Sequence, residues 1–186
     1  NSIIMAIQIN GNGTITGISA GGLPAGSVTS ATLASGAGGK ILQVVTGSAT
    51  SETSQGFSTN AFADTGLSTS ITPSSTSSKI LVTGYLCWYS DASGNGNHEF
   101  NFAICDGSNN ILDSTTATNR GYRFNEVYDA GGRHPICFLH SPNTTSSFTY
   151  KIRMNAQNTG HSANLYCQVN GTANNISRLT LMEIAA

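Results

Sequence analysis

From residue 40 to the end of the chain, apolar and polar residues alternate in short runs with the two-residue period of a β-strand. The clearest run is 147–155, where Phe148, Tyr150, Ile152 and Met154 fall on one face. No run has the roughly 3.6-residue period of an amphipathic helix. The predicted strands are 41–46, 56–61, 67–71, 79–89, 99–106, 111–114, 122–127, 136–140, 147–155, 164–169 and 178–184.

Turn residues separate these runs. Asp106-Gly107 and Asn170-Gly171 are turn dipeptides, and residues 91–97 contain glycines that accept positive φ. We interpret 91–97 as a hairpin turn between the strands on either side of it. About ten short strands in roughly 145 residues predict an all-β fold, an antiparallel two-sheet β-sandwich, with a jelly roll as the expected strand order.

Two predicted strands carry apolar residues on both faces. In 79–89 the second face holds leucine and tyrosine, and the closing strand 178–184 is apolar on both sides as well. A free-standing sandwich leaves its outer faces polar, so these strands predict a second cover. A partner subunit is one source of that cover, and a long loop of the same chain is the other. The candidate interface residues are Leu81, Tyr85, Tyr89, Leu181, Met182 and Ile184.

Residues 1–39 differ from the rest, and we place a domain boundary between this segment and 40–186. The segment is rich in glycine and small residues and cannot bury enough apolar area to order itself alone. A flexible linker is one interpretation. Spaced apolar residues, which a Gly/Ser linker lacks, indicate instead an extended attachment segment that docks on other chains. The candidate anchors are Ile7, Ile9, Ile15, Ile18 and Leu23.

Charge is scarce. Eight Lys and Arg stand against nine Asp and Glu in 186 residues, so no basic field attracts nucleic acid. No apolar run is long enough to span a membrane, so we expect no membrane insertion.

The sequence contains short matches to enzyme and metal-site motifs, but each match lacks a structural element or a ligand that the chemistry needs. Residues 17–21 match the nucleophile-elbow pattern, but glycine-rich flanks replace the strand and helix that it needs. The start of a calcium loop at 91–97 has Phe102 where the bidentate Glu belongs. The four cysteines form no CxxC pair; Cys87 and Cys105 would face each other across the predicted hairpin. We therefore expect no enzyme, no metal and no cofactor.

Residues 120–134 contain more charged residues than the rest of the chain, and they combine arginine with aromatic rings. Such side chains suit binding to a sugar or protein surface. The alternative is a strand whose rings enter the core and whose charges pair at a subunit boundary. The receptor-binding candidates are Arg120, Tyr122, Arg123, Phe124, Tyr128 and Arg133.

Several passages resemble one family. A strand, the Ser-Pro-Asn turn at 141–143 and the run 147–155 resemble the C-terminal head domain of bacteriophage fibre proteins, as do 67–82 and 177–184. The glycine-rich start is similar to the attachment segments of those fibres. The resemblance implies a homotrimer on the virion surface, bound to phage tail or capsid proteins through its N-terminal segment. Its head would bind a host cell-surface glycan or protein.

Two other functions stay open. A capsid head fibre or decoration protein would stabilise the shell, and the absence of a long shaft in the sequence favours it. A lectin-like or small-molecule-binding domain of a cellular organism is the third possibility.

Overall fold

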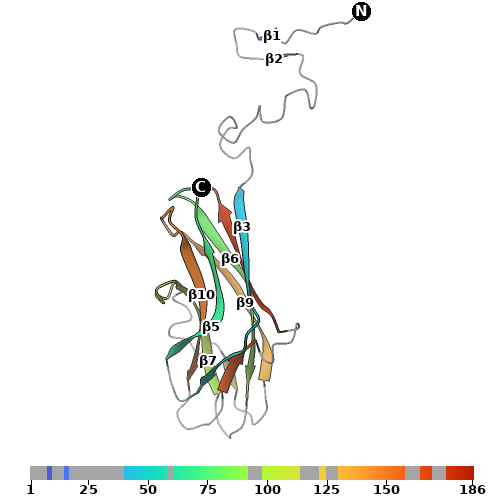
Figure 1. Cartoon of the computed structure of the whole chain (residues 1–186), viewed down its shortest axis with the longest axis vertical. Helices are drawn as coiled ribbons and strands as arrows, with labels where there is room; N and C mark the ends of the chain where they lie inside the picture. Colours follow the sequence, from blue (N-terminus) through green and yellow to red (C-terminus); the bar gives the residue numbers. More distant parts are fainter. Residues whose placement is uncertain are drawn as a thin grey trace, which may run out of the picture. The chain divides into compact units, whose positions relative to one another are not determined.

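The computed structural model describes residues 40–57, 61–91, 98–113, 130–157, 164–168 and 175–186, together with the strand pairing of 8–9, 15–16 and 122–124. The chain forms two compact units, Asn1–Gly39 and Lys40–Ala186. In the first unit, β1 (Gln8–Ile9) pairs with β2 (Ile15–Thr16) in antiparallel fashion. The second unit is the head, drawn in Figure 1.

The head contains a large antiparallel sheet built around β6 (Lys79–Ser90). Along one edge, β6 pairs from Ile80 to Ser90 with β9 (Ala130–His140). Along its other edge it pairs with β12 (Ser177–Ile184) and β11 (Asn164–Cys167). The outer strands are β3 (Ile41–Ala49), which pairs with β12, and β4 (Thr53–Gly56), which pairs with β11.

A smaller antiparallel sheet packs against it, in the order β5-β10-β7-β8. Its strands are β5 (Phe62–Ile71), β10 (Phe148–Gln157), β7 (His98–Asp106) and β8 (Tyr122–Phe124). Between β4 and β11, every connection except β7–β8 crosses from one sheet to the other. This connectivity brings strands that are far apart in sequence side by side.

Strands β11 and β12 act as one interrupted strand along β6. Cys167 lies opposite Trp88, and Arg178 lies opposite Tyr85. At the interruption, the Gln168 amide donates to the Cys87 carbonyl (3.2 Å), and the Cys87 amide donates to Ser177 Oγ (2.9 Å). Backbone groups of β6 that lose a strand partner are therefore still hydrogen-bonded, as buried polar groups must be.

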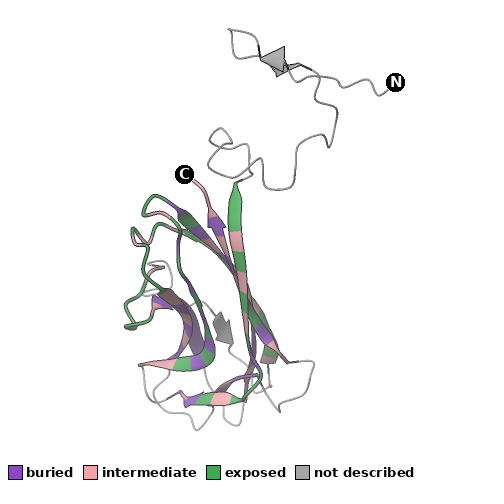
Figure 2. Ribbon diagram, turned by 45° about the horizontal axis from the view of Figure 1, so that its top comes forward, coloured by how far each residue is buried: buried purple, intermediate pink, exposed green. Residues whose placement is uncertain are grey.

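The core lies between the sheets, and Figure 2 shows buried and exposed residues alternating along the strands. Phe100 is at its centre, with ring contacts to Trp88 (4.8 Å between centroids) and Phe102 (5.7 Å). Glycine at position 47 lets β3 approach β5, because a Cβ there would overlap the Thr69 side chain. The largest fully buried apolar side chains are Phe57, Leu67, Ile80, Leu86, Phe100, Tyr150, Ile152, Met154, Leu165, Leu179 and Leu181.

The predicted all-β, antiparallel two-sheet sandwich is confirmed. The predicted hairpin at 91–97 is wrong, because β6 and β7 belong to different sheets; residues 92–97 themselves lie outside the described part. Cys87 and Cys105 are therefore not cross-strand neighbours. Residues 111–113 form no strand and contribute one bridge, Cys105 to Ile111. The strand predicted at 56–61 is also misplaced, since β4 ends at Gly56 and β5 begins at Phe62.

Candidate functional site

The most distinctive surface of the head is the outer face of the large sheet, where strand register aligns apolar residues across four strands. Val44 of β3 lies opposite Met182 of β12, Met182 opposite Leu81 of β6, and Leu81 opposite Leu139 of β9. Neighbouring strands are about 4.8 Å apart, so this row is about 14 Å wide. Val44 and Leu139 are 56% and 51% exposed.

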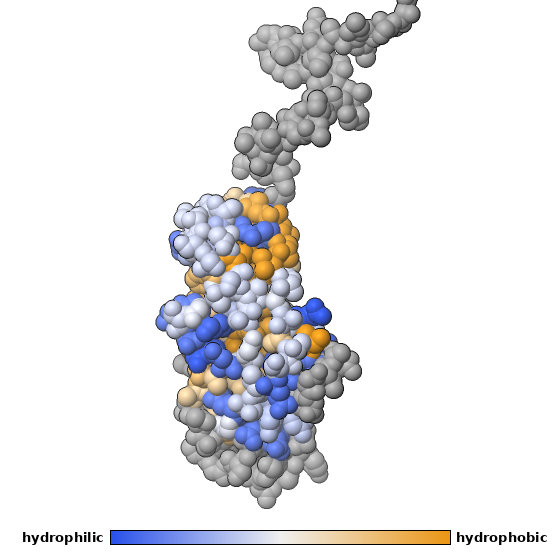
Figure 3. All heavy atoms as spheres, in the orientation of Figure 1, coloured by the Kyte–Doolittle hydropathy of each residue, from blue (hydrophilic) through white to orange (hydrophobic). Residues whose placement is uncertain are grey.

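The row continues toward the end of the sheet where β3 begins. We call the whole group the aliphatic zone: Ile41, Leu42, Val44, Leu81, Leu139, Met182 and Ile184. Figure 3 shows hydrophobic surface at this end of the head. Contiguous exposed apolar patches of this kind are typical of surfaces that contact other molecules.

Toward the other end of β6 the outer face changes character. The next row holds Thr46, Thr180, Thr83 and Cys137. Beyond it lies what we call the tyrosine–arginine zone: Tyr85, Tyr89, Tyr166, Arg133 and Arg178. Tyrosine and arginine are the side chains most enriched where proteins bind partners.

Within the tyrosine–arginine zone, the aromatic rings contact neighbouring side chains. The Arg133 guanidinium lies over the Tyr85 ring, 4.8 Å from its centroid. The rings of Tyr89 and Tyr166 lie 6.1 Å apart across β6 and β11. Beside them is a hollow of about 330 Å³ bordered by Cys87, Tyr89, Arg133, Asn175 and the glycine pair 131–132. The hollow belongs to the outer surface.

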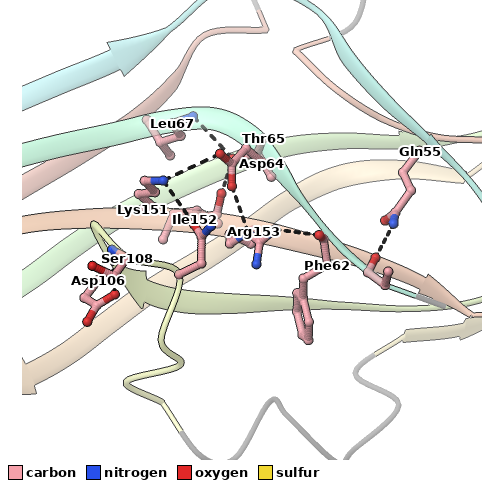
Figure 4. A network of polar contacts seen from close by, with 12 residues as sticks. Gln55, Phe62, Asp64, Thr65, Leu67, Asp106, Ser108, Lys151, Ile152 and Arg153 are labelled. Atoms are coloured by element: carbon pink, nitrogen blue, oxygen red, sulfur yellow. Dashed lines mark hydrogen bonds and ion pairs between the residues drawn. The ribbon is translucent and has the colours of Figure 1, made fainter. Parts of the chain in front are cut away.

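The smaller sheet presents a different outer face, on which the charges neutralise one another. Asp64 accepts a hydrogen bond from Arg153 Nε (2.7 Å) and forms an ion pair with Lys151 (3.6 Å). Arg153 also donates to the Phe62 carbonyl (2.6 Å), and Lys151 donates to Asn109 (3.0 Å). Figure 4 shows the Asp64 carboxylate between the two basic side chains. Because the cations are paired, this network suits stability more than ligand binding.

A second cavity, of about 220 Å³, opens between β7 and β9. Its wall includes the buried side chains of Phe102, Ile104, Ile136 and Ile152 and the ring of His134. Burial lowers the pKa of His134, so the imidazole is neutral at pH 7.

The described residues contain no group of three or more His, Cys, Asp or Glu able to hold a metal ion. All four cysteines are free thiols, and only Cys137 is exposed. Among the described residues there is no helix that is long and apolar enough to cross a membrane.

The predicted interface residues divide between the two zones. Leu81, Met182 and Ile184 lie in the aliphatic zone, and Tyr85 and Tyr89 in the tyrosine–arginine zone. Leu181 was wrongly assigned to an interface: it is fully buried between the sheets. The inner face of β12 carries Leu179, Leu181 and the buried Glu183, which leaves Met182 and Ile184 outside.

The structure does not bring the predicted receptor residues together on one strand. Tyr122, Arg123 and Phe124 form β8 at the edge of the small sheet, where they pair with 98–100 of β7. Arg133 lies on β9 of the large sheet. Arg120 and Tyr128 lie outside the described residues.

Of the predicted attachment residues, Ile9 and Ile15 pair directly between β1 and β2. Ile7, Ile18 and Leu23 lie outside the described part of the chain.

The sequence did not single out Ile41, Leu42, Val44, Leu139, Tyr166 or Arg178 as surface residues of interest. Their strands look half-buried one at a time, and only the pairing of β3, β12, β6 and β9 joins them into a patch. No protein-family model matches the chain. No curated protein matches the chain either.

Proposed function

We propose that this protein is a structural protein of a bacteriophage virion, a homotrimeric fibre whose head attaches the particle to the host surface. It acts through surfaces and not as an enzyme. The observation that carries the proposal is the aliphatic zone, whose row Val44–Met182–Leu81–Leu139 spans four of the six strands of the large sheet. The similarity of three sequence passages to phage fibre heads supplies the biological setting.

The partner that fits the aliphatic zone is a second copy of the same chain. The row Val44–Met182–Leu81–Leu139 carries no charge, and Lys79 lies at the end of the zone opposite Ile184. Burial of the exposed aliphatic side chains against another apolar surface is therefore the main favourable contribution to binding. Cyclic symmetry lets one patch on each copy meet the neighbouring copies around an axis. Three copies is the number that the family resemblance implies.

We assign the sandwich to the jelly-roll class. With β3/β4 and β11/β12 each counted as one interrupted strand, the large sheet has the order 1-8-3-6 and the small sheet 2-7-4-5. Two such sheets joined by Greek-key connections are the arrangement of double-sheet jelly rolls. This supports a virion role, since viral capsid domains use the same arrangement.

The division at residue 40 fits a protein with two tasks. The first unit would attach to phage tail or capsid proteins through its apolar residues, including the paired Ile9 and Ile15. The head would be presented for adsorption to a cell-surface glycan or protein. The capsid head fibre or decoration protein is the second candidate.

Light scattering on the purified full chain tests the assembly. We expect three copies per particle, and a monodisperse monomer at micromolar concentration would contradict the proposal. Leu81→Asp should give monomers, because each interface would bury an unpaired carboxylate. Ser68→Asp is the matched control, since Ser68 is exposed on a strand of the opposite outer face. That variant should remain trimeric.

Labelling the protein on phage particles tests its place on the virion. Gold-tagged antibody at the tail supports the host-attachment fibre, and antibody spread over the capsid supports the second candidate. Purified trimer should also compete with particles for adsorption to host cells. Failure to find the protein on particles would contradict both.

A further inference from the structure

The hollow in the tyrosine–arginine zone has a simple structural origin. Cys87 forms its floor and is only 6% exposed. Opposite Tyr89, β9 carries Gly131, which has no side chain to fill the outer face; the next residue, Gly132, faces the Trp88 ring of the core and borders the hollow with its backbone. The larger side chains of Tyr89 and Arg133 lie beside these small residues, and among the described residues Asn175, shortly before β12, also borders the hollow. Large residues next to small ones thus leave a depression of about 330 Å³, the size of a small-ligand site.

The chemistry of the border is selective. Arg133 is exposed, and its guanidinium lies over the face of the Tyr85 ring; it forms no ion pair with any residue that the structure describes. None of the described residues that border the hollow is acidic. In a chain with eight basic residues, this is an arginine left available to a carboxylate, which it can grip with two parallel hydrogen bonds.

The remaining groups suit a sugar. Tyr89 brings an aromatic ring to the border, the kind of group on which sugar rings pack, and Asn175 adds a polar side chain. We propose that the hollow binds a carboxylate-bearing sugar residue, such as a hexuronic acid, of an acidic cell-surface polysaccharide. This inference rests on the proposed function and names the class of its ligand.

The position of the hollow is compatible with assembly through the aliphatic zone. Ile184 pairs with Lys79 at one end of β6, and its neighbour Ala185 donates to the carbonyl of Lys40, where the head begins. Trp88 is nine residues further along β6, or about 30 Å at 3.3 Å per residue. Leu81, the residue of β6 in the aliphatic zone, is six residues from Cys87, or about 20 Å. Copies that meet at the aliphatic zone therefore leave the hollow toward the opposite end of the same face of the head.

The test uses the full-length protein with sodium glucuronate and with glucose in ligand-observed NMR. We expect glucuronate to bind and glucose to bind at least about tenfold more weakly, because glucose lacks the carboxylate that Arg133 would hold with two charge-assisted hydrogen bonds. Arg133→Gln should abolish this preference. Arg178→Gln is the matched control, because it removes the same charge from the same face outside the hollow. A second variant, Cys87→Leu, fills the floor and should weaken both sugars without changing charge.

Each other outcome overturns the inference. Equal binding of glucose and glucuronate would mean a neutral-sugar site. Equal losses in Arg133→Gln and Arg178→Gln would mean unspecific attraction of anions. If neither sugar binds to the unmodified trimer, the hollow is not a site for this class of ligand. Light scattering and host adsorption test the proposed function separately: a trimer that adsorbs but ignores glucuronate contradicts this inference alone.

Discussion

Glu183 of the closing strand is tied to Ser74, 109 residues earlier, by two hydrogen bonds to the same carboxylate oxygen: the Ser74 amide donates at 2.7 Å and its hydroxyl at 2.6 Å. Gln43 Nε2 donates to the other oxygen at 2.6 Å. The side chain is fully buried at one end of the sandwich. The closing strand, the first strand of the head and the turn before β6 are therefore joined through a single acid.

This acid makes stability depend on pH. Burial favours the neutral form of Glu183, but hydrogen bonds from Ser74, Gln43 and Ser78 outweigh it and lower the pKa from 4.5 to about 2. A lowered pKa means that the unfolded state binds more protons in this range, so stability falls as pH decreases from about 4.5 to about 2. The contribution at neutral pH is about 3 kcal/mol.

We expect Glu183→Gln to lose about 3 kcal/mol of unfolding free energy at pH 7, because an amide group replaces one acceptor oxygen with a donor. The variant should also lose most of the decline in stability between pH 5 and pH 2. Urea denaturation at fixed protein concentration across this range measures both effects. The exposed Glu52→Gln is the control, and an unchanged pH profile in Glu183→Gln would show that another group titrates.

A second polar residue holds the interrupted strand. With its amide oriented to match its neighbours, buried Gln168 donates to the carbonyls of Thr65 (2.9 Å) and Ser51 (3.1 Å) and accepts from Ser177 Oγ (2.7 Å). The side chain thereby connects both sheets at the break between β11 and β12. Gln168→Ala leaves two carbonyls and a hydroxyl without this partner, and each such loss costs about 1–3 kcal/mol.

Gln168→Ala should therefore lower the denaturation midpoint strongly, by about 3 kcal/mol of unfolding free energy in total. Hydrogen exchange should show added opening in β11 and β4 before the rest of the large sheet. Thr180→Ala, on the outer face of β12, is the control and should have little effect. Equal exchange in all strands of Gln168→Ala would mean that the residue stabilises the head as a whole.

The strands were predictable because alternation is a local property, and β6, β7 and β10 lie close to the predicted ranges. Their pairing was not. Turn residues after β6 indicate a change of direction, but they do not tell whether the next strand stays in the same sheet. The interface assignment of Leu181 was a second error: both faces of β12 are apolar, and nothing local in the sequence shows which face turns to the core.

The candidate surface shows the same limit. Apolar residues on the second face of β6 were visible in the sequence, and Leu81 and Met182 do lie next to each other. Val44 and Leu139 came from strands about 95 residues apart, and no local pattern links them. The hollow depends on Cys87 and Gly131, whose small size matters only once β6 and β9 are paired.

At Gly84, strands β6 and β12 approach so closely that a residue with a side chain does not fit. It lies in the middle of β6 with φ of +156°, and a Cβ there would overlap the carbonyl oxygen of Arg178 on β12. We expect Gly84→Ala to destabilise the head by about 3 kcal/mol, because β12 must move or the strand must distort. Gly107→Ala is the control, since its nearest contact would be an ordinary 3.4 Å from Thr149. Thermal unfolding compares the two.

Cys137 reports on whether the outer face is covered. It is exposed on β9, in the row next to Leu81 and Leu139, whereas Cys105 and Cys167 are buried. Burial raises the pKa of Cys167 to about 12, so this thiol is unreactive in the folded head. If copies meet at the aliphatic zone, iodoacetamide should label Cys137 several times more slowly in the unmodified protein than in Leu81→Asp. Peptide mass spectrometry measures the rates, with Cys167 as the internal standard for unfolding. Equal rates at Cys137 with Cys167 unlabelled would show that this face is open in the assembled protein and that the aliphatic zone is not the contact between copies.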